Sequence, residues 1–345
     1  MAHRPAAPYG PPMAPNPDSA HIAVVIPCYR VRAHLAGVLE RVGPWARTIV
    51  CVDDACPEES GKVAEEKAAI DERIVVVHRA ENGGVGAAMV TGYLEALDRG
   101  ATVLVKVDGD GQMDPRLAPA LVQPILDGEA DYVKGNRFFS PQTVAGMPWV
   151  RLLGNAGLSF MSKLSSGYWD LFDPTNGFTA LHGDVARALP LDRVHPRYFF
   201  ESDLLFRLGV LRAKVVELPL AAVYGEEQSN LSVTNALLTF PWLHLRNLTK
   251  RIGYNYVLRN VSVGSLYLGV GGALTGFGMA FGALMWARGA LEGDPATAGT
   301  VMLAALPVLL GFQFLVSFLN HDIASVPTVP LHPRLSRVQV LSARE

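Results

Sequence analysis

The sequence predicts an α/β fold, in which a mostly parallel sheet carries helices on both faces, followed by interfacial helices and two transmembrane helices. Three observations predict it. From His21 onward, short apolar segments rich in β-branched residues alternate with segments of helical periodicity. Aromatic and basic residues then mix over residues 231–260, and two long stretches without charged side chains follow. Alternating strands and helices pair as parallel strands joined by crossover helices.

The expected elements run in chain order from residue 22 to residue 218. The predicted strands cover residues 22–27, 48–52, 73–78, 103–107, 130–135 and 214–218. The predicted helices cover residues 32–42, 60–70, 82–99, 117–127, 151–165 and 201–211. Glycine, proline, tryptophan and tyrosine interrupt the pattern between residues 140 and 225, where residues 173–178 are expected to form a loop.

The segment 231–260 is expected to lie at a membrane interface, where aromatic and basic side chains are favoured. Its aromatic and basic residues are Phe240, Trp242, Tyr254, Tyr256, Arg246, Lys250, Arg251 and Arg259. Pro241 is expected to break the segment into two helices, because proline lacks the N–H that a helix interior needs. The alternative is an amphipathic helix packed against the preceding domain.

Two uncharged stretches, residues 261–287 and 296–320, are each long enough to cross the hydrocarbon core of a bilayer as a helix. Glycines in the first stretch have the spacing that allows close helix packing. A buried helical hairpin in a soluble protein is the alternative. Basic residues flank the outer ends of the pair, whereas Arg288 alone is basic in the connecting loop, so both ends are expected in the cytosol.

Composition narrows the function. A formal net charge of −2 argues against a nucleic-acid-binding protein. Cys28, Cys51 and Cys56 are too few for a disulfide framework and lack the spacing of a zinc site, so a reducing compartment is expected. The first residues contain no basic and apolar regions of a signal peptide.

These features divide the chain into five expected segments. They are a disordered tail rich in proline and alanine over residues 1–20, an α/β domain over 21–230, interfacial helices over 231–260, a transmembrane hairpin over 261–320 and a cytosolic tail over 321–345.

The strongest chemical signal is Asp108-Gly109-Asp110, which directly follows the apolar strand at residues 103–107. Ligands bind open α/β sheets at the carboxyl ends of strands. Two carboxylates there, on a backbone freed by glycine, suit a hard divalent cation that shares its ligands with a diphosphate. An acidic turn without a ligand is the alternative, because Asp and Gly are ordinary turn residues.

Other candidate site residues lie at or near the carboxyl ends of the predicted strands. They are Pro27 and Tyr29 after the first strand, Asp53 and Asp54 after the second, Gly83 and Gly86 after the third, and Lys106 within the fourth. Because the carboxyl ends of parallel strands meet at one edge, these residues can shape a nucleotide pocket. Tyr29 would stack on a base, an aspartate of the pair would bond base or ribose, and the glycines would start a helix whose N-terminus faces the site.

In this arrangement the chain resembles the family 2 glycosyltransferases, which have the Rossmann-like GT-A fold. The resemblance covers residues 21–230 and rests on four motifs: Val24-Val25-Ile26-Pro27-Cys28-Tyr29, Val52-Asp53-Asp54, Asn82-Gly83-Gly84-Val85-Gly86-Ala87-Ala88 and Asp108-Gly109-Asp110-Gly111-Gln112. Gly135-Asn136-Arg137-Phe138, Arg151 and Asp173-Pro174-Thr175-Asn176-Gly177-Phe178 make it most similar to the polyprenyl-phosphate sugar transferases, the dolichol-phosphate mannosyltransferase-like group.

The resemblance implies roles for these residues. Asp108 and Asp110 would act with Gln112 around Mg²⁺ or Mn²⁺ and the donor diphosphate. Arg137 and Arg151 would bind the lipid phosphate, which the planar guanidinium can contact through two hydrogen bonds. For these two arginines, a surface salt bridge and a helix-surface charge are the alternatives.

One segment departs from the family pattern. Related enzymes often carry a lysine in a Gly-x-Ser-Lys-like segment, whereas this chain has Asn230 at that place. A second acidic cluster contains Glu201 and Asp203, and in relatives that transfer to a hydroxyl such a carboxylate is the general base. Without that role, the two carboxylates would orient other groups or stabilise a helix N-terminus.

The sequence therefore predicts an inverting, metal-dependent glycosyltransferase that moves a sugar from a UDP- or GDP-sugar to undecaprenyl or dolichyl phosphate at the cytosolic membrane face. One alternative is transfer to a glycan or lipid-linked hydroxyl with Asp203 as general base. Another is a non-catalytic, membrane-anchored subunit that binds nucleotide sugars. A homo-oligomer is left open.

Overall fold

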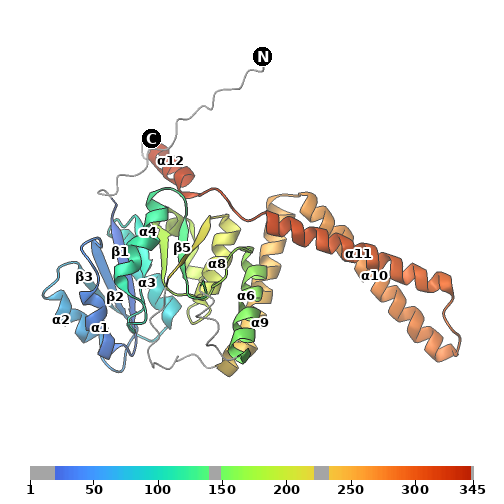
Figure 1. Ribbon diagram of the computed structural model, residues 1–345, viewed down its shortest axis with the longest axis horizontal. Helices are drawn as coiled ribbons and strands as arrows, with labels where there is room; N and C mark the ends of the chain where they lie inside the picture. Colours follow the sequence, from blue (N-terminus) through green and yellow to red (C-terminus); the bar gives the residue numbers. More distant parts are fainter. Residues whose placement is uncertain (1–19, 140–148, 221–232, 343–345) are drawn as a thin grey trace, which may run out of the picture. The chain divides into compact units, whose positions relative to one another are not determined.

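The computed structural model describes residues 20–139, 149–220 and 233–342. The chain divides into two compact units, one formed by Met1–His244 with Pro327–Glu345 and the other by Leu245–Val326. The first unit holds the sheet and its helices, and the second holds the two long apolar helices (Figure 1).

One sheet lies at the centre of the first unit. Within the described residues it contains seven strands in the order β3-β2-β1-β4-β6-β5-β7. The strands are β1 (Ile22–Cys28), β2 (Thr48–Asp53), β3 (Ile74–His78), β4 (Val103–Lys106), β5 (Tyr132–Asn136), β6 (Thr179–His182) and β7 (Val215–Pro219). All neighbouring strands are parallel except at β6, which runs antiparallel to β4 and β5. The predicted mostly parallel sheet is confirmed.

Strand β6 was not predicted. It has only four residues and lies between Gly177 and Gly183, so it shows neither the length nor the alternation by which a strand is recognised. Because β6 lies antiparallel between β4 and β5, the loop before it, residues 173–178, lies at the carboxyl ends of those two strands.

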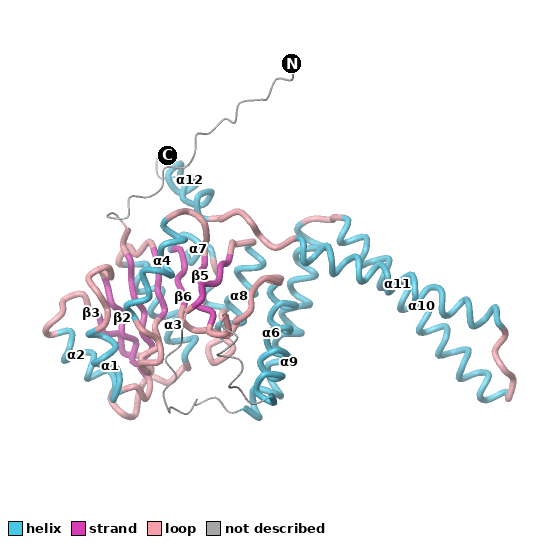
Figure 2. Tube along the Cα trace, viewed as in Figure 1, coloured by secondary structure: helices cyan, strands magenta, loops and turns pink. Residues whose placement is uncertain are grey.

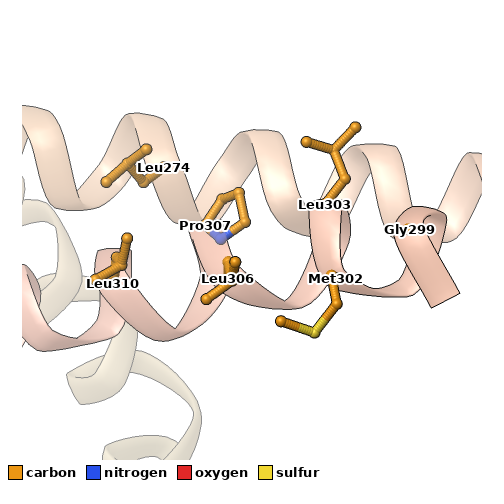
Figure 3. Close-up of a pocket in the computed structure, with 7 residues that line it drawn as sticks. All are labelled: Leu274, Gly299, Met302, Leu303, Leu306, Pro307 and Leu310. Atoms are coloured by element: carbon orange, nitrogen blue, oxygen red, sulfur yellow. The ribbon is translucent and has the colours of Figure 1, made fainter.

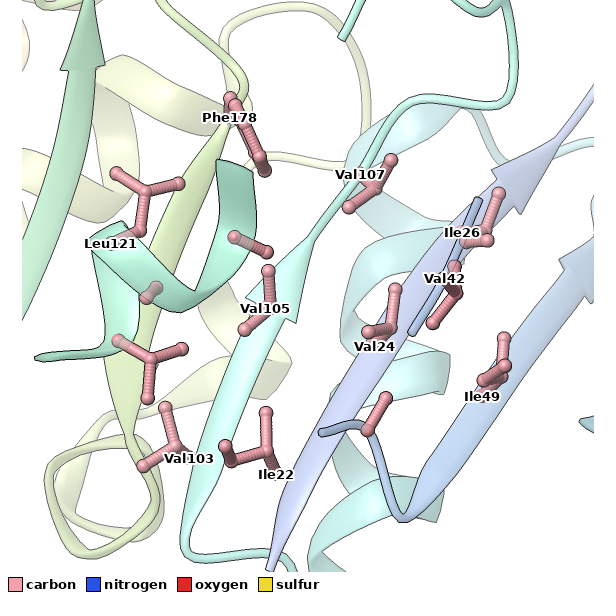
Figure 4. Close-up of a cluster of buried hydrophobic side chains, with 14 of the residues drawn as sticks. Ile22, Val24, Ile26, Val42, Ile49, Val103, Val105, Val107, Leu121 and Phe178 are labelled. Atoms are coloured by element: carbon pink, nitrogen blue, oxygen red, sulfur yellow. The ribbon is translucent and has the colours of Figure 1, made fainter. Parts of the chain in front are cut away.

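Helices cover both faces of the sheet, as predicted. The bounds are α1 (Arg32–Glu40), α2 (Ser60–Ala68), α3 (Val85–Asp98), η2 (Pro115–Leu117), α4 (Ala118–Leu126), α6 (Trp149–Ser166), α7 (Gly183–Ala188), η3 (Leu191–Arg193), α8 (Phe200–Leu211), α9 (Val233–Ile252) and α12 (His332–Ser342). The buried residues Val24 and Ile26 of β1 share a hydrophobic cluster with α1 and α4 (Figure 4). Val25, on the opposite face, packs against Gly92 of α3.

Helix α9 differs from the prediction, which placed a break at Pro241. The helix continues through this proline to Ile252, and a π-helical segment, η4 (Gly253–Arg259), follows. On either side of Pro241, the rings of Phe240 and His244 pack edge-on against Phe199, with centroids 5.3 and 4.8 Å away. These contacts offset the lost hydrogen bond, so the predicted break was wrong and the irregularity begins at Gly253 instead.

The second unit is built around α10 (Val263–Glu292) and α11 (Ala298–Ala324), both long and apolar enough to cross a membrane. Their backbones approach closely at some glycines, whereas Gly272 and Gly276, which have the expected small-residue spacing, have no atom within 4 Å of an added Cβ. A Cβ added at Gly311 would come within 2.6 Å of Thr275 N, and one at Gly278 within 2.6 Å of Ala304 O. A shallow apolar hollow of about 350 Å³ lies beside Leu274 and Pro307 (Figure 3).

A buried ion pair ties the start of the second unit to its end. The guanidinium of Arg251 donates to both carboxylate oxygens of Asp322, at 2.7 and 2.9 Å, and the hydroxyl of Tyr256 donates to the same carboxylate at 2.6 Å. Both charged residues are almost fully buried. The end of α9 and the end of α11 are therefore fixed to each other.

The segment after α11 folds back onto the first unit, where a tail was expected. The buried carboxylate of Asp131, just before β5, accepts hydrogen bonds from Leu331 N at 2.7 Å, His332 N at 2.8 Å and Lys214 N at 2.7 Å. Burial opposes the charged form of Asp131, but its hydrogen bonds outweigh this effect and lower its pKa. The His332 ring also stacks on His182 at 4.2 Å.

Candidate active site

The Asp108-Gly109-Asp110 turn lies where β4 ends, against the end of β1. A Cβ at Gly109 would come within 3.0 Å of Val31 and 3.4 Å of Pro27 O, so glycine permits this close approach. The carboxylate of Asp110 accepts a hydrogen bond from the backbone N–H of Gln112 at 3.0 Å. The side chains of Asp108, Asp110 and Gln112 are half-buried, which leaves them accessible to a ligand.

Lys106, the last residue of β4, holds this turn through Asp108. Its side chain is buried, and Nζ lies 2.6 Å from Asp108 Oδ1 and 3.4 Å from Glu201 Oε1. Burial opposes the charged form of Lys106, but the two carboxylates outweigh this effect and raise its pKa. The ammonium therefore stays protonated and fixes Asp108 and Glu201 in one cluster.

The 173–178 loop contacts residues of both β4 and β5. A Cβ at Gly177 would overlap Lys106 Nζ and come within 2.8 Å of Asp108 Oδ2, so only glycine leaves room for this contact. The preceding residue is held from the other strand, because Lys134 Nζ donates to Asn176 O at 2.6 Å. The loop thus connects Asp108 to β5.

Lys134 is a site-supporting residue that the sequence analysis missed. Its side chain is fully buried, and burial lowers its pKa to about 8. The available signal was a lysine within the predicted strand 130–135, since lysine is almost never fully buried without a partner.

Arg137 forms a bidentate ion pair with Asp173. Its Nε and one terminal nitrogen donate to the two carboxylate oxygens at 2.8 and 2.9 Å. Asp173 is fully buried, and its own N–H donates to Glu217 at 2.7 Å. The side chain of Arg137 is about one-third exposed. Arg151 belongs to α6, but its side chain lies outside the described residues, as does Asn230.

Asp54 holds the glycine segment before α3 through hydrogen bonds to its backbone. Its buried carboxylate accepts hydrogen bonds from Gly83 N at 3.0 Å and Gly84 N at 2.7 Å, and Arg79 lies 2.8 Å away. The neighbouring Asp53 accepts from Cys56 N at 2.9 Å. Both carboxylates therefore shape the ends of β2 and β3.

The glycines before α3 make room for another part of the same chain. A Cβ at Gly86 would overlap His195 O, and one at Gly84, whose φ is +92°, would come within 2.9 Å of Pro196 O. Pro196 O also accepts a hydrogen bond from Ala87 N at 2.9 Å. The start of α3 is therefore occupied by the 195–197 loop.

Asp203 anchors that loop. Its carboxylate is buried, and Oδ2 accepts from His195 N and from Arg207 Nε, both at 3.0 Å. Glu201, two residues earlier, instead lies beside Lys106. The structure thus gives the two acidic residues of α8 different partners: Asp203 binds the 195–197 loop, and Glu201 lies beside Lys106 and Asp108. Tyr29 is half-buried, with the Arg30 guanidinium 5.5 Å from its ring.

The site has two carboxylates at the carboxyl end of β4, a central strand of the sheet. Comparison with known proteins defines the class of protein to which the chain belongs. The model of the family "Glycosyl transferase family 2" matches residues 23–189. The chain belongs to this family and is a glycosyltransferase.

Two bacterial relatives are similar over most of their own length. Undecaprenyl-phosphate mannosyltransferase of Micrococcus luteus is 31% identical over 59% of this chain and 84% of the relative. Polyprenol monophosphomannose synthase of Mycolicibacterium smegmatis is 34% identical over 57% of this chain and 75% of the relative.

A solved structure shares the fold. Glucosyl-3-phosphoglycerate synthase from Mycobacterium tuberculosis, in complex with Mn²⁺, UDP and phosphoglyceric acid, matches with a TM-score of 0.50 and 20% identity over 68% of this chain and 80% of that one. The predicted GT-A fold is confirmed.

Proposed function

We propose that this glycosyltransferase moves a sugar, with inversion, from a UDP- or GDP-sugar to a polyprenyl phosphate at the cytosolic face of a membrane. The observation that carries the proposal is the Asp108-Gly109-Asp110 turn, which presents two half-buried, accessible carboxylates at the end of β4. The acceptor class is supported by the relatives, which are named for undecaprenyl phosphate and polyprenol.

The donor set at this turn fits Mg²⁺ or Mn²⁺. Asp108, Asp110 and the amide of Gln112 offer hard oxygen ligands, which these ions prefer. No group of three or more His, Cys, Asp or Glu side chains that could hold a metal occurs among the described residues. A cation here would therefore complete its coordination with diphosphate oxygens and water. When bound, it would neutralise charge on the leaving diphosphate.

The chain's own residues would position the reactants. Lys106 holds Asp108, and the 173–178 loop carries Asp173, which orients Arg137. The guanidinium of Arg137, whose side chain is partly exposed, is suited to bind a phosphate oxygen. A phosphate monoester has a second pKa near 6, so it is largely ionised at pH 7 and needs no strong base to attack a sugar carbon.

Transfer to a hydroxyl with Asp203 as general base is the competing proposal. The burial of Asp203 and its contacts with His195 N and Arg207 argue against it, because the carboxylate is enclosed in the domain and binds the 195–197 loop. Of the two acidic residues, Glu201 is the one placed beside Asp108 through Lys106.

The folded-back C-terminal segment supports the membrane topology. Helix α12 and the first part of α9 both belong to the first unit, so the two ends of the α10–α11 hairpin return to the same domain. If both helices cross the bilayer, the domain and both hairpin ends lie on one side. The distribution of basic residues favours the cytosolic side.

The test is transfer of radiolabelled sugars from UDP- and GDP-sugars to undecaprenyl phosphate by the full chain in nanodiscs. Asp110→Ala and addition of EDTA are each expected to reduce labelled lipid by at least about 100-fold, since the metal stabilises the leaving diphosphate. Asp127→Asn, an exposed carboxylate at the end of α4, is the control and should retain activity. Labelled lipid formed at the normal rate with EDTA present would refute metal dependence.

A further inference from the structure

Glu217 lies in the middle of β7, which ends the described sheet beside β5 (Figure 2). An acidic residue on such an edge strand is ordinarily a solvated surface charge. Here the side chain is half-buried, because Val216 and Leu218 pack on the hydrophobic cluster and Glu217 projects from the opposite face of the strand. Its register partner on β5 is Lys134, which holds the 173–178 loop, so Glu217 faces the same loop.

The carboxylate of Glu217 accepts three hydrogen bonds. Phe172 N and Asp173 N donate to its two oxygens at 2.8 and 2.7 Å, and the side-chain amide of Asn136 donates at 3.0 Å. Two of these donors belong to the backbone that enters the 173–178 loop, and the third lies at the end of β5. Hydrogen bonds to a charged acceptor are roughly twice as strong as neutral ones. Glu217 therefore ties the 172–173 backbone to the end of β5.

Both of the segments that Glu217 ties together hold Arg137. Asn136 Oδ1 accepts a hydrogen bond from Phe138 N at 2.9 Å, which fixes the backbone on either side of the arginine. Asp173 accepts a hydrogen bond from Arg137 N at 3.1 Å, in addition to the two bonds from the guanidinium. The backbone and the side chain of Arg137 are thus both positioned by residues that Glu217 holds.

The far end of the 173–178 loop has its own anchors. Lys134 Nζ donates to Asn176 O at 2.6 Å, and the next residue, Gly177, packs against Asp108. Because the two ends of the loop are held by different groups, a change at Glu217 should displace the arginine and leave the metal-binding turn in place.

We propose that Glu217 is a positioning residue, which fixes the guanidinium of Arg137 for the phosphate of the acceptor. The inference rests on the proposed function, because that function assigns the acceptor phosphate to Arg137. A displaced guanidinium loses a bond that it makes both in the bound complex and in the transition state, so the loss appears in KM for the acceptor and not in kcat. A glutamate that only stabilised the fold would change no KM selectively.

The test compares Glu217→Gln with Glu95→Gln in the full chain in nanodiscs. Glutamine has one acceptor oxygen where glutamate has two, and its amide group would face a backbone N–H, so one bond to the 172–173 backbone is lost. KM for undecaprenyl phosphate is expected to rise about ten-fold, while kcat and KM for the sugar nucleotide stay within about two-fold of wild type. Glu95, which pairs with Arg99 on α3, is the control, and its variant should leave all three constants unchanged.

Reversal of one hydrogen bond separates positioning from general damage. Asn136→Asp places a second carboxylate against Glu217 and should by itself raise KM for the acceptor. When Asn136→Asp is combined with Glu217→Gln, the donor and the acceptor of this hydrogen bond exchange places. KM for the acceptor should then fall below that of either single variant. A double variant that is no better than the worse single variant would overturn the proposal.

Amide hydrogen exchange gives a measurement that needs no acceptor. Exchange at Phe138, Phe172 and Asp173 is expected to be about ten-fold faster in Glu217→Gln and unchanged in Glu95→Gln. Unchanged exchange at these amides, or faster exchange with an unaltered KM for the acceptor, would contradict the proposal. A wild-type chain that transfers no sugar to undecaprenyl phosphate would instead refute the proposed function, and the exchange rates would still decide whether Glu217 holds the segment that carries Arg137.

Discussion

At the scale of single residues, carboxylates that look equivalent in the sequence have different partners in the structure. Asp108 and Glu201 share the buried ammonium of Lys106, whereas Asp203 binds the 195–197 loop and Arg207. A buried carboxylate with such partners stabilises the fold, because removing its charge leaves the other ion unpaired.

Asp203→Asn is therefore expected to lower the free energy of unfolding by about 3 kcal/mol, because Arg207 loses its buried partner. Activity should fall through displacement of the 195–197 loop, with the shape of the pH–rate profile unchanged. Denaturant titration and the pH dependence of kcat check both parts. Loss of the acidic limb with stability intact would instead identify Asp203 as a general base.

Lys134 gives a prediction about pH. Its pKa is about 8 in the folded chain and that of an unfolded lysine is near 10.4, so both states hold the proton below pH 8. Between these values only the unfolded chain stays protonated, and stability gains a contribution that rises with pH. Lys134→Met should abolish this contribution, whereas Lys62→Met, on the surface, should retain it. Unfolding midpoints from pH 7 to pH 10.5 provide the measurement, and identical slopes for Lys134→Met and wild type would contradict the assignment.

At the scale of elements, the glycine segment before α3 was recognised from sequence, but its contact was not. We expected the glycines to permit close backbone approach at the start of a helix that faces the site, and the structure shows the 195–197 backbone in close contact with them. The sequence can show where a close backbone approach is possible, since glycine permits it, but it does not show which segment approaches.

Gly86→Ala should therefore destabilise the domain by about 1–3 kcal/mol, because the added Cβ overlaps His195 O. Gly37→Ala is the matched control, since no atom lies within 4 Å of its added Cβ in the middle of α1, and it should be neutral or slightly stabilising. Chemical denaturation of both variants would decide, and an equal effect on the two would contradict the contact.

Six of the seven strands and the main helices were predictable because apolar periodicity is a local signal. Strand β6 and the uninterrupted helix α9 were not, since each depends on partners distant in sequence. For β6 these are β4 and β5, and for α9 the partner is Phe199. The same holds for Lys134, whose acceptor is 42 residues away.

At the scale of the whole molecule, the chain leaves and rejoins its domain around the hairpin of apolar helices. Asp131 receives the returning segment at the start of β5, at the opposite end of that strand from Arg137. This contact ties the C-terminal segment to the sheet that carries the active site.

The proposed topology can be measured by thiol labelling with a membrane-impermeant maleimide. Ala296→Cys, in the loop between α10 and α11, should react in sealed cells, whereas Thr328→Cys, before α12, should react only in inside-out vesicles. Both positions are exposed, and the native cysteines are buried. Reaction of both thiols from the same side would show that the hairpin does not cross the bilayer.

The sequence by itself determined the α/β class, the two apolar helices and the strand-end motifs, because periodicity and turn chemistry are read over a few neighbouring residues. Only the tertiary structure decided which polar groups meet. It placed Lys106 between Asp108 and Glu201 and paired Arg137 with Asp173. It also placed Asp203 where its carboxylate accepts a hydrogen bond from the 195–197 loop. The physical reason is that a buried charge takes its partner from whatever the fold brings within a few ångströms, and that partner is set by strand order and loop path rather than by sequence neighbours.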